Sequence, residues 1–172
     1  MQQLLGKSLS STDLMRIMRN QCKIYTYNEL SRIKSLDQLF GPYNCVFILY
    51  ETRKNYGHWC VLTRDHNRIT FFDSYGIFPD MELKWTPQAF RRRNNMILPH
   101  LTSLLYHDKS GREIHYNNHR LQRMNKKIAT CGRWCAVFAL MHSFCPVELF
   151  ADHFLHYTNN PDKHITDLTY FI

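Results

Sequence analysis

Short apolar runs and amphipathic stretches alternate along this chain, and turn-forming residues separate them. The run at residues 45–50 follows the breaker Gly41-Pro42 and is rich in β-forming residues, which predicts a buried strand. The polar residues 65–67 lie between two similar segments and predict the turn of a hairpin. The predicted strands are residues 45–50, 58–63, 68–73 and, at a sheet edge, 113–116.

Apolar side chains at helical spacing predict helices around these strands. Residues 10–13 have the composition of a helix start, and Leu14, Ile17 and Met18 follow at helical spacing. The other predicted helices are residues 27–33, 89–105 with an interruption at Pro99, 131–142, 146–157 and 162–170. Together the elements indicate an α+β fold with a central, mainly antiparallel sheet flanked by helices.

The length of 172 residues fits one domain, residues 1–172, that can bury a sizeable core. The sequence contains no internal repeat and no Gly/Ser-rich linker. No apolar run reaches the ~20 residues that cross a bilayer, and the first residues lack the basic and apolar regions of a secretory signal. We therefore expect a soluble, monomeric protein made inside a cell, with no membrane partner.

Six cysteines raise the question of disulfides or a metal. In the expected reducing compartment, cysteines are buried apolar residues, metal ligands or nucleophiles. Cys131, Cys135 and His142 come nearest to a ligand pattern, since a gap of four places two side chains on one helix face. A structural zinc ion needs a fourth ligand, which the sequence does not offer. We expect no metal site.

The chain carries 22 Lys and Arg against 14 Asp and Glu, a net charge of +8. Such an excess attracts polyanions at long range and also keeps a protein soluble. Both interpretations, contact with nucleic acid and a solvated basic surface, stay open. The densest basic groups are Arg91, Arg92 and Arg93, and then Arg120, Arg123, Lys126 and Lys127.

A histidine and an aspartate occupy neighbouring strand ends of the predicted hairpin. His58 follows Gly57 at the start of one strand, and Asp73 closes the paired strand. A turn near Asn67 would bring both to the same end of the sheet, where a carboxylate can orient an imidazole and stabilise its cation. The alternatives are a structural histidine and a carboxylate that caps the turn.

Cys131 begins the apolar helix. A thiol in the first turn lies beside unpaired backbone N–H groups and the positive end of the helix dipole, which favour the thiolate. The N–H of Cys131 could help bind an oxyanion, and Gly132 would let a substrate backbone approach closely. Cys135, one turn further, should face the core. The alternative for Cys131 is a buried small residue.

Four motifs in a fixed order carry a family resemblance: GHW, FFDSYG, LQ and TCGRWC. Their order resembles that of the adenain-like cysteine peptidases, the clan that also contains the SUMO proteases. The version YNNHRLQ…TCGRWC is most similar to capsid-maturation proteases of large DNA viruses, virophages and virus-like DNA transposons. The resemblance covers residues 44–144. It implies a papain-like fold with the permuted order His, Asp, Gln, Cys.

The resemblance also implies roles for particular residues. His58 corresponds to the general base, Asp73 to the acid that orients it, Cys131 to the nucleophile and Gln122 to the oxyanion-hole glutamine. The gap of nine positions between Gln122 and Cys131 is slightly longer than usual in the clan, which leaves a solvent-facing glutamine as the alternative.

Three residues are expected to bind substrate. By the resemblance, Trp59 helps cover a narrow channel that admits a small P1 residue. Gly57 and Gly132 are expected to leave room for backbone beside the reacting centre.

The implied function is cleavage of viral capsid or other structural precursors during virion maturation. Such an enzyme requires no cofactor, although DNA or an activating peptide can assist it, and viral DNA is an expected partner. The expected locations are the virion and, during assembly, the viral factory in the host cytoplasm or the nucleus. Two alternatives are an isopeptidase that removes ubiquitin or SUMO, and a basic nucleic-acid-binding module without catalysis.

Overall fold

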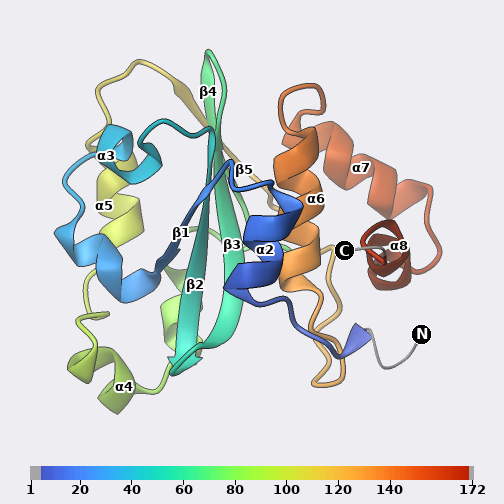
Figure 1. Cartoon of the computed structure of the whole chain (residues 1–172), viewed down its shortest axis with the longest axis horizontal. Coiled ribbons are helices and arrows are strands. Elements are labelled where there is room, and N and C mark those ends of the chain that lie inside the picture. Colours follow the sequence, from blue (N-terminus) through green and yellow to red (C-terminus); the bar gives the residue numbers. More distant parts are fainter. Residues whose placement is uncertain (1–4, 171–172) are drawn as a thin grey trace.

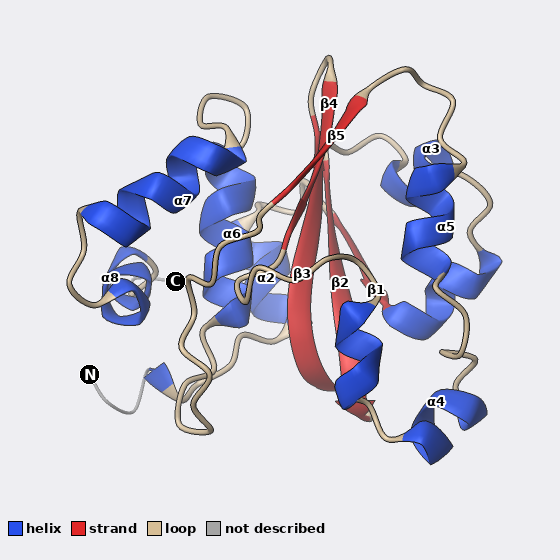
Figure 2. Cartoon of the chain, turned by 180° about the vertical axis from the view of Figure 1, so that it is seen from behind, coloured by secondary structure: helices blue, strands red, loops and turns tan. Residues whose placement is uncertain are grey.

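The computed structural model describes residues 5–170 and confirms the α+β class, with a five-stranded open sheet between two groups of helices (Figures 1 and 2). The strands follow one another across the sheet in sequence order. They are β1 (Lys23–Thr26), β2 (Cys45–Arg53), β3 (Tyr56–Arg64), β4 (Arg68–Phe72) and β5 (Glu113–Tyr116). β3 and β4 pair antiparallel, which confirms the predicted hairpin, and β2 and β3 are also antiparallel, while β1 and β5 add to the edges in parallel.

The helices cover both faces of the sheet (Figure 1). On one side lie α2 (Ser11–Ile17), α6 (Cys131–Met141), α7 (Val147–His156) and α8 (Pro161–Leu168). On the other side lie the 3₁₀ helix η1 (Tyr27–Arg32), α3 (Leu36–Phe40), α4 (Gln88–Arg93) and α5 (His100–Tyr106). A second 3₁₀ helix, η2 (Met81–Trp85), contacts β2.

Each face of the sheet has its own hydrophobic core. Trp59 and Val61 on β3 belong to the core beneath α6, whereas Cys60 and Leu62 belong to the core beneath η1, α3 and α5. Because both faces are covered, β2 is apolar at every position from Cys45 to Tyr50 rather than alternating. Successive side chains of β3 point to opposite faces of the sheet, and this alternation decides which neighbours His58 has.

Three short elements, β1, α3 and η2, are absent from the sequence-based prediction. Each has four or five residues, too few to display a period of their own. The helix expected over residues 89–105 is divided more widely than Pro99 alone suggests, because residues 94–99 are not helical and Asn95 has a positive φ of 54°. No helix within residues 5–170 is long and apolar enough to cross a membrane.

Candidate active site

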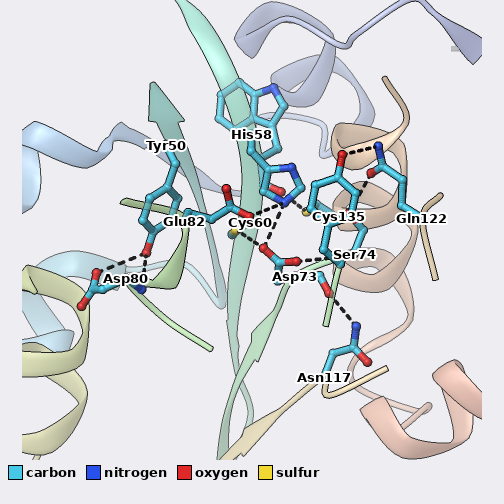
Figure 3. Close-up of polar contacts among 12 residues, drawn as sticks. Tyr50, His58, Cys60, Asp73, Ser74, Asp80, Glu82, Asn117, Gln122 and Cys135 are labelled. Carbon is cyan, nitrogen blue, oxygen red and sulfur yellow. Dashed lines mark hydrogen bonds and ion pairs between the residues drawn. The ribbon is translucent and has the colours of Figure 1, made fainter. Parts of the chain in front are cut away.

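His58 and Asp73 meet at one end of the central hairpin, and Nε2 of His58 lies 3.0 Å from Oδ2 of Asp73 (Figure 3). His58 is in the first half of β3, and Asp73 directly follows β4. The register pairs Val61 with Phe72, so the next residue along β4 reaches back toward the start of β3. Local strand geometry therefore brings together two residues that are fifteen positions apart.

Asp73 is fully buried and is held by several donors. Besides His58, the thiol of Cys60 donates to Oδ2 over 3.1 Å, and the backbone N–H of Tyr75 donates to Oδ1 over 2.6 Å. Asn117 donates its side-chain N–H to the Asp73 carbonyl. Burial alone would raise the pKa of Asp73, but the charge and hydrogen bond of His58 and the other donors lower it. The carboxylate is ionised and fixed, so the proton between the pair belongs on Nε2 of His58.

A second carboxyl group approaches the same imidazole. Oε1 of Glu82, on η2, lies 3.6 Å from Nε2 of His58, is buried and has no hydrogen-bond partner among residues 5–170. Burial and the neighbouring Asp73 raise the pKa of Glu82 to about 7, although His58 opposes the shift. For His58, burial lowers the pKa, but the charge of Asp73 and of the other acidic groups around the ring outweighs burial and raises the pKa well above 6.5. These neighbours favour the protonated form of the imidazole.

Cys131 is the first residue of α6 and is 5% exposed. Its side chain belongs to the core cluster that includes Trp59, the residue that follows His58 on β3. Nε2 of His58 is the ring nitrogen that Asp73 engages, and within the described part of the chain no hydrogen bond uses Nδ1. Cys135, one turn further into α6, is fully buried and donates its thiol to the Trp59 carbonyl over 3.2 Å, which confirms that it faces the core.

Gln122 lies next to this cluster and is 1% exposed, so the alternative of a solvent-facing glutamine is wrong. Its Oε1 accepts a hydrogen bond from the Ser74 hydroxyl over 2.8 Å, and its Nε2 donates to the Tyr75 hydroxyl over 3.2 Å. The backbone N–H groups of Leu121 and Gln122 both donate to the Ser74 carbonyl. The ring of Tyr75 stacks on His58 with centroids 4.7 Å apart. These contacts tie the glutamine to the segment that carries Asp73.

The predicted substrate-binding residues occupy two settings. Gly57 and Trp59 line a cleft of about 430 Å³ between the N-terminal segment, β1 and the β2–β3 hairpin. Gly132 faces Leu9 and Trp59, and an added Cβ there would lie 3.1 Å from each. The Leu9 carbonyl accepts a hydrogen bond from the Trp59 indole over 2.9 Å. In this structure Gly132 thus makes room for the N-terminal segment and Trp59.

The donor atoms of His58, Cys60 and Asp73 lie within 4.8 Å of one another, a spacing that could hold a metal ion. Those atoms already hydrogen-bond to one another through Asp73, so the chemistry of the set is that of a charge-stabilised imidazole. The alternative zinc set fails on geometry. Cys131 begins α6 and His142 caps its far end, about 16 Å away at the helical rise per residue.

The two basic groups lie far apart. Arg91, Arg92 and Arg93 form the end of α4, and the group 120–127 lies on the loop that leads into α6. Figures 1 and 2 show α4 and α6 on opposite sides of the sheet. Arg92, Arg93 and all four residues of the second group are exposed. The second group flanks the segment that carries Gln122 and Cys131.

Sequence reasoning missed two residues that touch the pair. Cys60 could have been found, because it is two positions from His58 and alternation puts both on one face of β3. Glu82 offered no signal, since it reaches His58 through a 3₁₀ helix that no pattern predicts.

The fold and the site define an α+β protein in which an imidazole, a carboxylate and a buried glutamine lie at one sheet end, with a cysteine at the start of α6. No protein-family model matches the chain. Uncharacterized protein V9 of Sputnik virophage is 36% identical over 166 residues, which is 94% of this chain and 94% of that protein. The chain therefore belongs to the same family as this virophage protein. Among solved structures, the ASFV pS273R protease matches with a TM-score of 0.47 and 13% identity, over 95% of this chain and 68% of that chain.

Proposed function

We propose that this protein is a cysteine endopeptidase. The observation that carries the proposal is the His58–Asp73 pair at 3.0 Å, with Cys131 at the adjoining helix start. A nucleophile, a base and an orienting carboxylate in hydrogen-bond reach are the requirement for covalent acyl transfer. Gln122, buried beside the pair, supplies a donor for the oxyanion.

In the proposed mechanism the thiolate of Cys131 attacks the scissile carbonyl while His58 holds the proton. The backbone N–H of Cys131 and the side chain of Gln122 stabilise the tetrahedral oxyanion, where losing one donor typically costs ~10²–10³ in rate. His58 then gives its proton to the leaving amine, and a water molecule that His58 activates resolves the thioester. Asp73 keeps Nε2 protonated and the ring oriented throughout. Every step uses protein groups and water alone.

We propose viral capsid or other structural precursors as the substrates. Two observations support this choice: a relative in a virophage, and the resemblance of the LQ…TCGRWC motif to capsid-maturation proteases. His58 and Cys131 are 8% and 5% exposed, which suits the entry of an extended chain with small side chains at the cleavage point. The corresponding locations are the virion and the sites of particle assembly.

The test compares wild-type protein with Cys131→Ala and with Cys145→Ala, a matched control because Cys145 lies outside the site. Each is incubated with capsid precursor of the virus and, separately, with ubiquitin and SUMO conjugates. We expect wild type and Cys145→Ala to cleave the precursor and Cys131→Ala to be inactive. Full activity in Cys131→Ala would overturn the proposal, and cleavage of conjugates alone would identify an isopeptidase instead.

We propose further that DNA assists the enzyme through the group Arg120, Arg123, Lys126 and Lys127, which borders the site. If the protein contacts about four phosphates, raising the salt concentration from about 50 to about 200 mM should weaken DNA binding roughly a hundredfold. Two alanine variants distinguish the two basic surfaces, which lie on opposite sides of the sheet. One replaces the group that borders the site, and the other replaces Arg91, Arg92 and Arg93. If duplex DNA neither binds nor changes cleavage at low salt, the charge serves solubility.

A further inference from the structure

A buried carboxylate on α8 reaches two segments of the candidate site. Asp162 is 1% exposed and accepts three hydrogen bonds: from the Arg123 backbone N–H over 3.0 Å, from the Thr130 hydroxyl over 2.6 Å and from the Trp134 indole over 3.2 Å. None of the lysines, arginines and histidines within residues 5–170 forms an ion pair with Asp162. The carboxyl group is therefore satisfied by neutral donors, an arrangement that fixes geometry because a buried polar group loses much if a donor moves.

The contact with Thr130 changes the start of α6. Thr130 is the N-cap residue, and a threonine in that position ordinarily accepts a hydrogen bond from an N–H of the first turn. Here its hydroxyl donates to Asp162, and no side chain caps the helix. A capping side chain at Thr130 would engage the N–H of Gly132 or Arg133, so these two groups are left for another acceptor, and the N–H of Cys131 at the first helical position lies beside them. In an acyl-transfer site that acceptor is the oxyanion or the thiolate.

The contact with Arg123 acts on the other oxyanion donor. Arg123 directly follows Gln122, so its backbone N–H anchors the glutamine segment from one side while the Ser74 carbonyl holds it from the other. The same carboxylate thus holds residues adjacent to Gln122 and to Cys131, although these two lie nine positions apart. α8 packs beside α6, which keeps the carboxylate in place (Figure 1).

We propose that Asp162 is a positioning residue that holds the glutamine segment and the start of α6 in register, so that the two oxyanion donors converge on one point. The inference rests on the proposed peptidase function and adds a residue to it. Asparagine at this position keeps one acceptor oxygen but presents an N–H₂ group toward a donor, so it disturbs the register with little change in volume.

The test is the turnover of Asp162→Asn per folded molecule, with the folded fraction of each sample taken from its urea unfolding curve. We expect kcat to fall about tenfold to a hundredfold, the range for a small misplacement of catalytic groups, with a smaller change in KM. Thr130→Val should behave similarly, and Thr130→Ser, which keeps the hydroxyl donor, should lose less. Asp167→Asn on the same helix, where Asp167 pairs with Lys163 at the surface, is the matched control.

A double-mutant cycle separates positioning from stability. In a Gln122→Ala background the additional loss from Asp162→Asn should shrink, because the donor that it positions is gone. If the losses in kcat of Gln122→Ala and Asp162→Asn multiply fully in the double variant, or if kcat is unchanged in Asp162→Asn, the proposal is overturned. The rate at which iodoacetamide alkylates Cys131 needs no substrate and should also fall in Asp162→Asn, so an unchanged rate counts against it too. Activity that survives Cys131→Ala defeats the peptidase assignment itself, which is a different result.

Discussion

Replacing Glu82 with glutamine removes a charge beside His58 and almost no volume. The group ordinarily titrates near 4.5, and burial and Asp73 raise its pKa to about 7 in the folded chain. Below about pH 4.5 the carboxyl is neutral whether the chain is folded or unfolded. Between 4.5 and 7 the unfolded chain gives up this proton first, so stability falls as the pH rises through this window.

The size of the effect follows from the same two values. A carboxyl that titrates near 7 when folded and near 4.5 when unfolded lowers the free energy of unfolding by about 3 kcal/mol once both states are ionised. Glutamine cannot ionise, so this loss is absent from Glu82→Gln. Relative to wild type, the variant should therefore gain about 3 kcal/mol between pH 4.5 and pH 8.

Urea unfolding at several pH values in this window measures the difference in free energy of unfolding between Glu82→Gln and wild type. His58 and Asp73 contribute their own pH dependence to both proteins. Asp167→Asn is the control, because Asp167 is exposed and pairs with Lys163 at the surface, and this variant should follow the wild-type curve within about 0.5 kcal/mol. The pKa of His58, followed by NMR, should fall in Glu82→Gln because one of the charges that raise it is gone. Parallel stability curves for wild type and Glu82→Gln would refute the raised pKa of the buried Glu82.

The remaining predictions concern the strand ends and the helix core. Gly57→Ala should lower the urea midpoint strongly, by the equivalent of more than about 2 kcal/mol, because its Cβ would lie 1.9 Å from the Tyr50 carbonyl oxygen; an unchanged midpoint would contradict this packing. Cys135→Ala should retain cleavage and lose about 1–3 kcal/mol of stability, measured by the same unfolding assay, and loss of turnover per active site would argue for a chemical role. Asp73→Ala should lower kcat more than it raises KM, and Asp73→Asn should retain part of the orientation of His58; steady-state kinetics decides, and equal turnover in all three proteins would mean that another group holds the ring.

Local pattern was sufficient for the central part of this fold. The apolar run at 45–50, the polar turn at 65–67 and the helical spacing after Cys131 each reflect interactions between residues close in sequence, so β2, the β3–β4 hairpin and α6 were predictable. The juxtaposition of His58 and Asp73 follows from the same information, because an antiparallel hairpin sets which residues face each other. The order of the four motifs added Gln122 through resemblance.

Contacts between distant segments were decided by the tertiary structure alone. Glu82 reaches His58 through a five-residue 3₁₀ helix, and Asp162 reaches the start of α6 from the last helix. Nothing within several residues of either one marks it, because a polar residue near a helix end ordinarily faces solvent. Burial of these two carboxyl groups depends on how η2 and α8 pack against the sheet and against α6, which is a property of the assembled core and leaves no period in the sequence.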